Sequence, residues 1–237
     1  MPARLSCILP AYNEAPRIGA VLACVLDHPL IDEVIVVDDG STDGTATVVA
    51  GHPGARLIAL SWNGGKTAAI ATGVQAARHD LLLFLDGDLL GLAPDHLTAL
   101  IRPVLTGQAD VSISLRRNAP LLWRLIGIDY ISGERVMPRS LLPTAGLLAT
   151  LPRFGLEVAM NAGWIAARAR IAVVRWPGVT SPFKHAKRGL LAGLRADLAM
   201  LRDIFATVPL HRTAHQIWQM RRLSHPRRRQ TVQAIGT

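Results

Sequence analysis

Short apolar segments alternate with amphipathic segments over the first 115 residues, and this alternation constrains the fold more than any other feature of the 237-residue chain. Five runs rich in Leu, Ile and Val have the length of strands and end beside turn-forming residues: 5–9, 33–37, 56–60, 81–85 and 110–115. Between them, residues 15–26, 66–77 and 95–105 have helical spacing, and Ser41-Thr42-Asp43 offer an N-cap for a shorter helix ending near residue 50. This order predicts an α/β fold with a mostly parallel sheet, covered by helices on both faces because the strands are apolar throughout.

The alternation weakens beyond residue 116. The pattern there predicts helices within 118–131, 140–151, 158–169 and 190–205, and one more strand at 171–174. The sequence has no internal repeat, and it has no linker that would separate a second folded unit. We therefore expect one domain over residues 1–211, whose halves are 1–116 and 117–211, followed by a basic tail at 212–237.

Composition excludes several other classes of protein. Half of the residues are hydrophobic and 18% are charged, which excludes a disordered chain. Cys7 and Cys24 lie in apolar segments without CxxC spacing, so we expect neither a disulfide framework nor a structural zinc site, and a cytoplasmic location. No secretory signal is visible, and the longest uncharged stretch, residues 140–152, is shorter than the roughly 20 residues of a membrane-spanning helix.

Charge is distributed unevenly along the chain. Residues 1–157 carry 12 Lys and Arg against 15 Asp and Glu, whereas residues 158–237 carry 14 against 2. The basic tail contains Trp218 and six arginines: Arg212, Arg221, Arg222, Arg227, Arg228 and Arg229. This pattern permits peripheral contact with anionic lipid at the inner face of a membrane, and a tail that is simply solvated is the plainer interpretation. No recognition motif for nucleic acid is present, and we do not expect nucleic acid to be a partner.

Four of the predicted strands lead into polar, turn-forming segments at 10–14, 38–41, 63–66 and 86–88. In an open parallel sheet, ligands bind beyond the carboxyl ends of the strands, so these segments predict one site. The carboxylates of Asp86 and Asp88 flank Gly87 and suit a divalent cation such as Mg²⁺ or Mn²⁺, but an Asp-Gly turn is the plain alternative.

The segment 63–66 opens a helix, where backbone N–H groups and Lys66 favour a phosphate, although it lacks the spacing of a P-loop and also fits an ordinary loop. The chain has only three lysines, which draws attention to this one. Asp38-Asp39 stand where an acidic residue binds the nucleoside in α/β folds, or simply cap a turn. The first loop has no GxGxxG, which argues against an NAD-binding fold.

These segments occur in a characteristic order: PAYNE at 10–14, VVDDGSTDGT at 36–45, NGGKTAAIATG at 63–73 and FLDGDL at 84–89. Over residues 4–116 the chain resembles glycosyltransferase family 2, which has the GT-A fold of nucleotide-diphospho-sugar transferases. SGERVM at 132–137, FGLEV at 154–158 and PGV at 177–179 are similar to bacterial members, including those of the glucosyl-3-phosphoglycerate synthase type.

The resemblance assigns residues to the donor. It implies that the nucleotide-sugar is held by Pro10, Ala11, Tyr12, Glu14, Asp39, Gly65, Lys66, Asp86 and Gly87. Within this set Asp39 would contact the base and Lys66 the base or diphosphate. Asp86 and Asp88 would form the DxD motif, in which Asp88 binds the metal directly and Asp86 binds the ribose or the metal. The metal, Mg²⁺ or Mn²⁺, would neutralise the leaving diphosphate.

The resemblance also assigns an acceptor side. Glu157 would hold the acceptor or remove its proton, while a helix N-terminal Glu favoured by the macrodipole is the alternative. Gly133, Glu134 and Arg135 would shape the acceptor side, with Arg135 contacting an anion. Family members often have a His metal ligand soon after the late Gly-Val; here the nearest is His185, so either it serves or the metal has one protein ligand fewer.

We therefore expect a bacterial, metal-dependent hexosyltransferase. It would move a sugar from a nucleotide-diphosphate donor, UDP-linked rather than GDP-linked, to a hydroxyl or phosphate on a small-molecule or lipid-linked acceptor. Two alternatives stay open. One is a non-catalytic protein that binds nucleotide-sugars with the same fold. The other is a sugar-phosphate nucleotidyltransferase, whose Gly-rich basic first loop is missing here.

Overall fold

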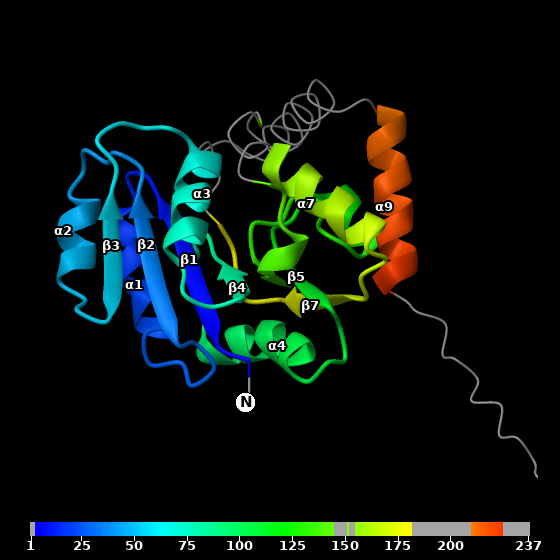
Figure 1. The fold of residues 1–237 in the computed structure, drawn as a ribbon, viewed down its shortest axis with the longest axis horizontal. Coiled ribbons are helices and arrows are strands. Elements are labelled where there is room, and N and C mark those ends of the chain that lie inside the picture. The colour runs from blue at the N-terminus through cyan, green and yellow to red at the C-terminus, as the bar shows by residue number, and fades with distance from the viewer. Residues whose placement is uncertain (1–2, 145–150, 152–154, 182–209, 225–237) are drawn as a thin grey trace, which may run out of the picture.

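The computed structural model describes residues 3–144, 151, 155–181 and 210–224, which form a seven-stranded sheet between helices (Figure 1). The strands are β1 (Leu5–Ala11), β2 (Glu33–Asp38), β3 (Ala55–Ala59), β4 (Leu81–Phe84), β5 (Val111–Arg116), β6 (Arg135–Pro138) and β7 (Ile171–Trp176). The helices are α1 (Ala15–Val25), α2 (Thr45–Ala50), α3 (Lys66–Ala76), α4 (Pro94–Leu105), α5 (Leu121–Ile126), α7 (Gly155–Ala166) and α9 (Leu210–Ser224), with a 3₁₀ turn, η1, at Arg139–Leu141.

The strands lie in the order β3-β2-β1-β4-β6-β5-β7. Neighbouring strands are parallel except for β6, which is antiparallel to both β4 and β5. In the β4–β6 pair, Phe84 lies opposite Arg135. The start of β6 therefore meets the end of β4, and the residues just before β6 reach the carboxyl edge of the sheet.

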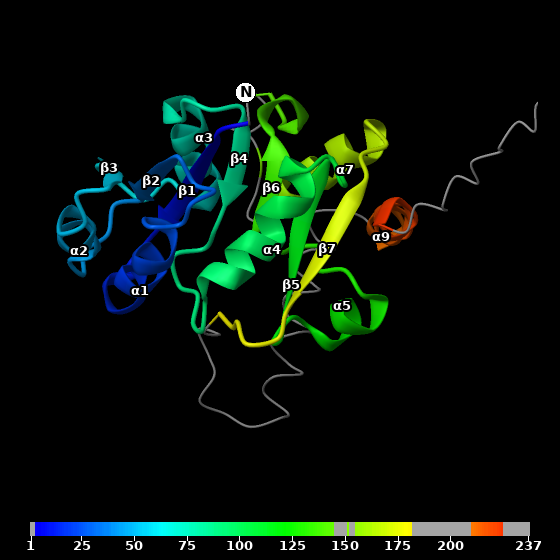
Figure 2. The same cartoon turned by 90° about the horizontal axis from the view of Figure 1, so that it is seen from below.

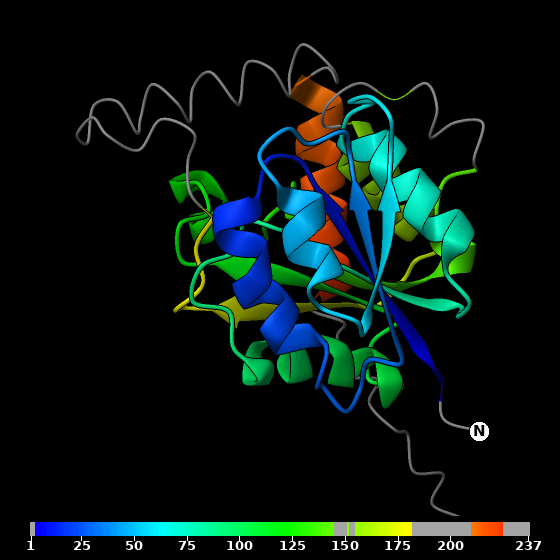
Figure 3. The ribbon, with the colours of Figure 1, turned by 90° about the vertical axis from the view of Figure 1, so that its left-hand side faces the viewer.

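Alternate side chains of each central strand enter different cores, as the period of a strand requires. In β1, Cys7 and Leu9 pack with α1, α2 and α4, whereas Ile8 packs on the side of α3, α7 and α9. Figure 3 shows α1 and α2 on one side of β1–β3 and α3 on the other. Because both faces are buried, the predicted mostly parallel α/β sheet with helices on both faces is confirmed.

Two local predictions were wrong, and one predicted helix is shorter than its segment. β6 was missed, because its four residues follow a polar segment and are too short for a periodic signal. The helix within 118–131 is limited to α5, which ends at Gly127 in the left-handed region with φ of 81°. The cap of α2 is Gly44, also left-handed, and the Asp43 carboxylate accepts the Thr45 N–H at 3.1 Å instead of capping the helix itself.

Of the predicted helix at 140–151, the described residues contain only the end of η1, and residues 142–144 are not helical. The predicted helix at 190–205 lies outside the described residues.

The helix α9 lies at the β7 edge of the sheet, beside α7 (Figure 2). Its Thr213 and Met220 are buried, so part of the predicted tail packs onto the domain. The division of the chain at residues 116 and 211 stays a prediction. No helix in the described ranges is long and apolar enough to cross a bilayer.

Candidate active site

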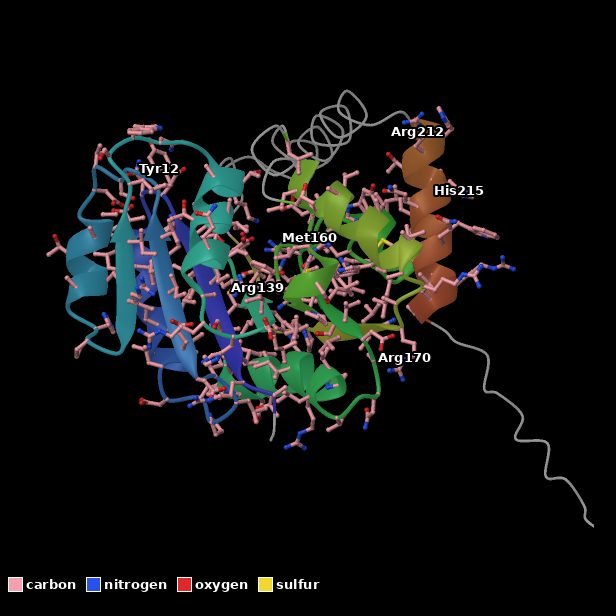
Figure 4. The ribbon with its side chains drawn as sticks, viewed as in Figure 1. Tyr12, Arg139, Met160, Arg170, Arg212 and His215 are labelled. Carbon is pink, nitrogen blue, oxygen red and sulfur yellow. The ribbon has the colours of Figure 1, made fainter. Side chains whose placement is uncertain are left out.

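Side-chain hydrogen bonds tie the loops after β1 and β2 together. Asn13, in the left-handed region with φ of 56°, donates its backbone N–H to the Ser41 hydroxyl at 2.9 Å. Its side-chain oxygen accepts the Thr42 N–H at 2.9 Å, and Ser41 in turn donates to the Asp38 carboxylate. These bonds fix one rim of the site, where Tyr12 stands exposed at the end of β1 (Figure 4).

Asp39 positions the loop that leads into α3. Its buried carboxylate accepts the backbone N–H groups of Gly64 and Gly65, each at 2.8 Å. Gly65 has φ of 88°, which favours glycine, and the helix begins at the next residue. The structure thus brings Asp39, Gly65 and Lys66 together, whereas the Glu14 carboxylate forms an ion pair with Arg17 at 2.6 Å.

Lys66 joins the ends of three elements. Its ammonium lies 2.7 Å from Asp86 Oδ1, just after β4, and 3.4 Å from Glu157 Oε1, in the first turn of α7. Burial alone would lower the pKa of Lys66, but the charges of Asp86 and Glu157 outweigh it and raise this pKa above its usual value. Burial opposes ionisation of Asp86, but Lys66 and Arg116 nevertheless lower its pKa. The pair is therefore ionised at neutral pH.

Gly133 provides the space for this ion pair. A Cβ atom at this position would lie 2.6 Å from Asp86 Oδ1 and 2.7 Å from Lys66 Nζ. Both distances are shorter than normal van der Waals contact, so the two charged groups occupy the volume that a side chain would need. Gly133 lies just before β6, and the reversed direction of that strand brings it here.

Asp88 faces a different part of the chain. The Ser181 hydroxyl donates to both of its carboxylate oxygens, at 2.9 and 3.1 Å. An antiparallel bridge between Leu90 and Thr180 holds the segment after β7 in this position. Burial and the negative charge of Asp86 raise the pKa of Asp88. A cation beside Asp88 would offset both effects.

A buried polar network centred on Glu134 lies next to the site. Glu134 accepts hydrogen bonds from the hydroxyls of Ser114 at 2.6 Å and Ser132 at 2.7 Å, and its other oxygen lies 3.3 Å from Arg116 Nη1. The pKa of Arg116 is raised, against the effect of burial, by the charges of four acids, which in decreasing order of influence are Glu134, Asp86, Asp129 and Asp88. Arg116 and Ser181 are not among the site residues predicted from the sequence. Arg116 directly follows the predicted fifth strand at 110–115, just as acidic segments follow other predicted strands, and that position was the available signal.

Glu134 and Arg135 have internal partners. Arg135 is 1% exposed, donates to the carbonyls of Ser132 and Tyr130 and to Asn161, and lies 5.0 Å over the Trp164 ring. These contacts correct the expectation that Arg135 binds an anion, because its guanidinium is enclosed in the core. Gly87, named above in the donor-binding set, does not have a positive φ.

The charges at the site suit a divalent cation. Five buried or half-buried carboxylates (Asp86, Asp88, Asp129, Glu134, Glu157) face three cations (Lys66, Arg116, Arg135), which leaves an excess of negative charge. In the described ranges no group of three or more His, Cys, Asp or Glu could by itself hold a metal. Asp88 with Asp86 therefore fits a hard cation whose remaining ligands are phosphate oxygens. His185 lies outside the described residues.

The matched family model agrees with this geometry. Residues 6–141 match "Glycosyl transferase family 2", and because this is more than half of the chain, the protein belongs to that family. The fold and motifs are therefore those of a glycosyltransferase with the GT-A fold, as the sequence predicted.

Relatives span different sugars and acceptors. The chain is 34% identical over 175 residues to glucosyl-3-phosphoglycerate synthase of Mycobacterium tuberculosis, which covers 69% of this chain and 53% of the relative. It is 28% identical over 177 residues to dodecaprenyl-phosphate galacturonate synthase of Rhizobium johnstonii, covering 63% and 52%. At best the chain thus spans about half the length of these curated relatives.

A solved structure of the mycobacterial synthase, with Mn²⁺, UDP-glucose and phosphoglyceric acid, resembles this fold with a TM-score of 0.68. The identity is 28%, and the match covers 90% of this chain and 80% of the other.

Proposed function

We propose that this chain transfers a hexose from a UDP-sugar, with Mg²⁺ or Mn²⁺, to a hydroxyl or phosphate of its acceptor. The observation that carries the proposal is the cluster of Lys66, Asp86 and Glu157 beside Asp88. It combines a cation, a pair of carboxylates and a buried acid at the carboxyl edge of the sheet. The solved relative with Mn²⁺ and UDP-glucose supports this donor class.

The donor would lie across the loops after β1, β2 and β4. Asp39 orders the glycine loop and so places Lys66, whose ammonium would face the diphosphate. Asp88, with Asp86, would hold the metal, which when bound supplies a Lewis acid that stabilises the leaving diphosphate. Ser181 fixes the orientation of the Asp88 carboxylate.

The acceptor would approach from the side of α7. Glu157 is 4% exposed, and its Oε2 has no hydrogen-bond partner within the described part of the chain. A carboxylate held in this way can accept the proton of an acceptor hydroxyl. As the proton leaves, the hydroxyl oxygen of the acceptor bonds to the anomeric carbon of the sugar, and the bond from that carbon to the diphosphate breaks.

Titration calorimetry of UDP and GDP, with and without Mn²⁺, tests the proposal. We expect the wild-type protein to bind UDP in a Mn²⁺-dependent manner. Asp88→Asn, which keeps the shape and removes the charge, should weaken that binding about a hundredfold. Asp95→Asn is the matched control, since Asp95 is exposed in the first turn of α4.

Equal Mn²⁺-dependent binding by wild-type protein and Asp88→Asn would refute the metal assignment. Binding of GDP in place of UDP would refute the donor class.

A further inference from the structure

Exposed apolar side chains gather on α5 and α9. Of the seven large apolar side chains that are strongly exposed in the described ranges, three lie on α5: Leu121 at 59%, Leu122 at 43% and Leu125 at 74%. Trp218 on α9, at 51%, is a fourth. Trp123 of α5 is fully buried and anchors the helix, so the three leucines are not needed to pack it.

The two helices enclose an apolar groove of about 390 Å³. Leu122, Trp123 and Ile126 line it from α5, and Ile217, Trp218 and Arg221 from α9. We call the exposed leucines of α5, this groove and the outer face of α9 the α5–α9 surface.

The charge of the α5–α9 surface has one sign. Arg124 on α5 and Arg212, Arg221 and Arg222 on α9 are exposed, and neither helix contains an acidic residue. The Arg222 guanidinium lies 4.2 Å from the centre of the Trp218 ring. The His215 ring stacks with the same Trp218 ring, and the two ring centres are 5.8 Å apart. Figure 4 shows Arg212 and His215 projecting outward from α9.

We propose that the α5–α9 surface docks the protein on an anionic phospholipid bilayer. Exposed leucines would enter the acyl boundary, Trp218 suits the headgroup depth because its ring is amphipathic, and the arginines pair with lipid phosphates. An apolar protein partner would explain the groove but not four arginines without any acid. Because α5 follows closely after Arg116, docking would hold the active site beside the bilayer.

Co-sedimentation with vesicles tests this proposal independently of sugar transfer. The full chain is mixed with phosphatidylcholine vesicles, with or without phosphatidylglycerol. We expect binding only to the anionic vesicles, and we expect it to weaken as salt is raised. The double variant Leu121→Asn with Leu125→Asn should weaken binding at least about tenfold.

Two further variants sharpen the result. Arg124→Gln with Arg222→Gln should also release the protein, because it removes charge without touching the leucines. Trp62→Ala is the matched control, since Trp62 is 75% exposed but follows β3, at the opposite edge of the sheet. Circular dichroism checks that each variant is folded.

Three outcomes would overturn the proposal. The first is no binding of the wild-type chain to anionic vesicles, and the second is binding by the leucine and arginine variants that equals that of the wild type. The third is a loss of binding with Trp62→Ala as large as that of the leucine variant. Concentration-dependent dimers that the leucine variant abolishes, without vesicle binding, would assign the surface to a second copy of the chain.

Discussion

At the scale of single residues, the site depends on close approach between charged groups. Lys66 neutralises Asp86, whereas Asp88 accepts hydrogen bonds from the Ser181 hydroxyl and, within the described residues, forms no ion pair, so the two carboxylates of the DxD motif have different environments. The pKa of Asp86 is lowered and that of Asp88 is raised. The unequal environments leave Asp88 as the carboxylate best placed to gain from an added cation.

Gly133→Ala tests the steric requirement at this ion pair. The added methyl group would displace Lys66 or Asp86, so we expect a loss of at least about tenfold in kcat/KM, or roughly 1.4 kcal/mol of transition-state stabilisation. Gly178→Ala is the control, because a Cβ there meets no atom within 4 Å. Steady-state kinetics of both variants measures the difference, and equal kinetics would show that the pair tolerates displacement.

Glu157→Gln separates two roles of this residue. If Glu157 removes the acceptor proton, kcat should fall by about 10²–10⁴-fold with little change in KM for the donor. If it only holds the acceptor, the KM for the acceptor should rise while kcat stays near that of the wild type. We expect the first result, because one oxygen of the carboxylate is buried without a partner.

Asp129 gives the stability a pH dependence. Burial is the main cause that raises its pKa, from 3.8 to about 6, against the opposing charge of Arg116. Ionisation therefore costs more in the folded state, and this cost is absent below about pH 4 and complete above about pH 6.

Asp129→Asn should therefore stabilise the protein at pH 7 by about 1–3 kcal/mol relative to its effect near pH 4. Thermal unfolding at both pH values measures this difference. A gain that does not depend on pH would contradict the assignment to ionisation.

At the scale of helices and strands, the βα units from β1 to β5 were predicted within one or two residues. Their strands are apolar and their helices periodic, as for Ala15–Val25, so local sequence determines both. The elements after β5 depend on contacts distant in sequence: β6 exists because β4 and β5 flank it, and α9 because α7 and β7 cover it. The motifs located the donor loops, but the contacts of Arg116 and Ser181 depend on chain reversal and could not be read from spacing.

Met220→Ala tests whether α9 belongs to the folded domain. Met220 is fully buried in the core that contains α7, so truncation should lower the free energy of unfolding by about 2–5 kcal/mol. Arg212→Ala, at an exposed position of the same helix, should change it by less than about 0.5 kcal/mol. Chemical denaturation measures both, and a neutral Met220→Ala would assign α9 to a detachable tail.

At the scale of the whole molecule, an acidic site and a basic surface occupy the same chain. The excess of carboxylates lies around Asp86 and Asp88, whereas exposed arginines lie on α9 at the β7 edge. This separation allows one part of the molecule to attract a metal and the other to attract anions. For the described residues, it matches the direction of the uneven charge distribution along the sequence.

The position of β6 has a consequence for synthesis on the ribosome. When residue 116 has emerged, β4 still has an open edge and β5 has no neighbour to pair with, because neither β6, which joins them, nor β7 has yet emerged. The nascent chain must keep an apolar edge, Leu81–Phe84, from pairing with other chains until about twenty further residues emerge. The antiparallel strand β6, which brings Gly133 to the candidate active site, is thus also the segment that covers the open edge of β4 and so protects the nascent chain from pairing with other chains.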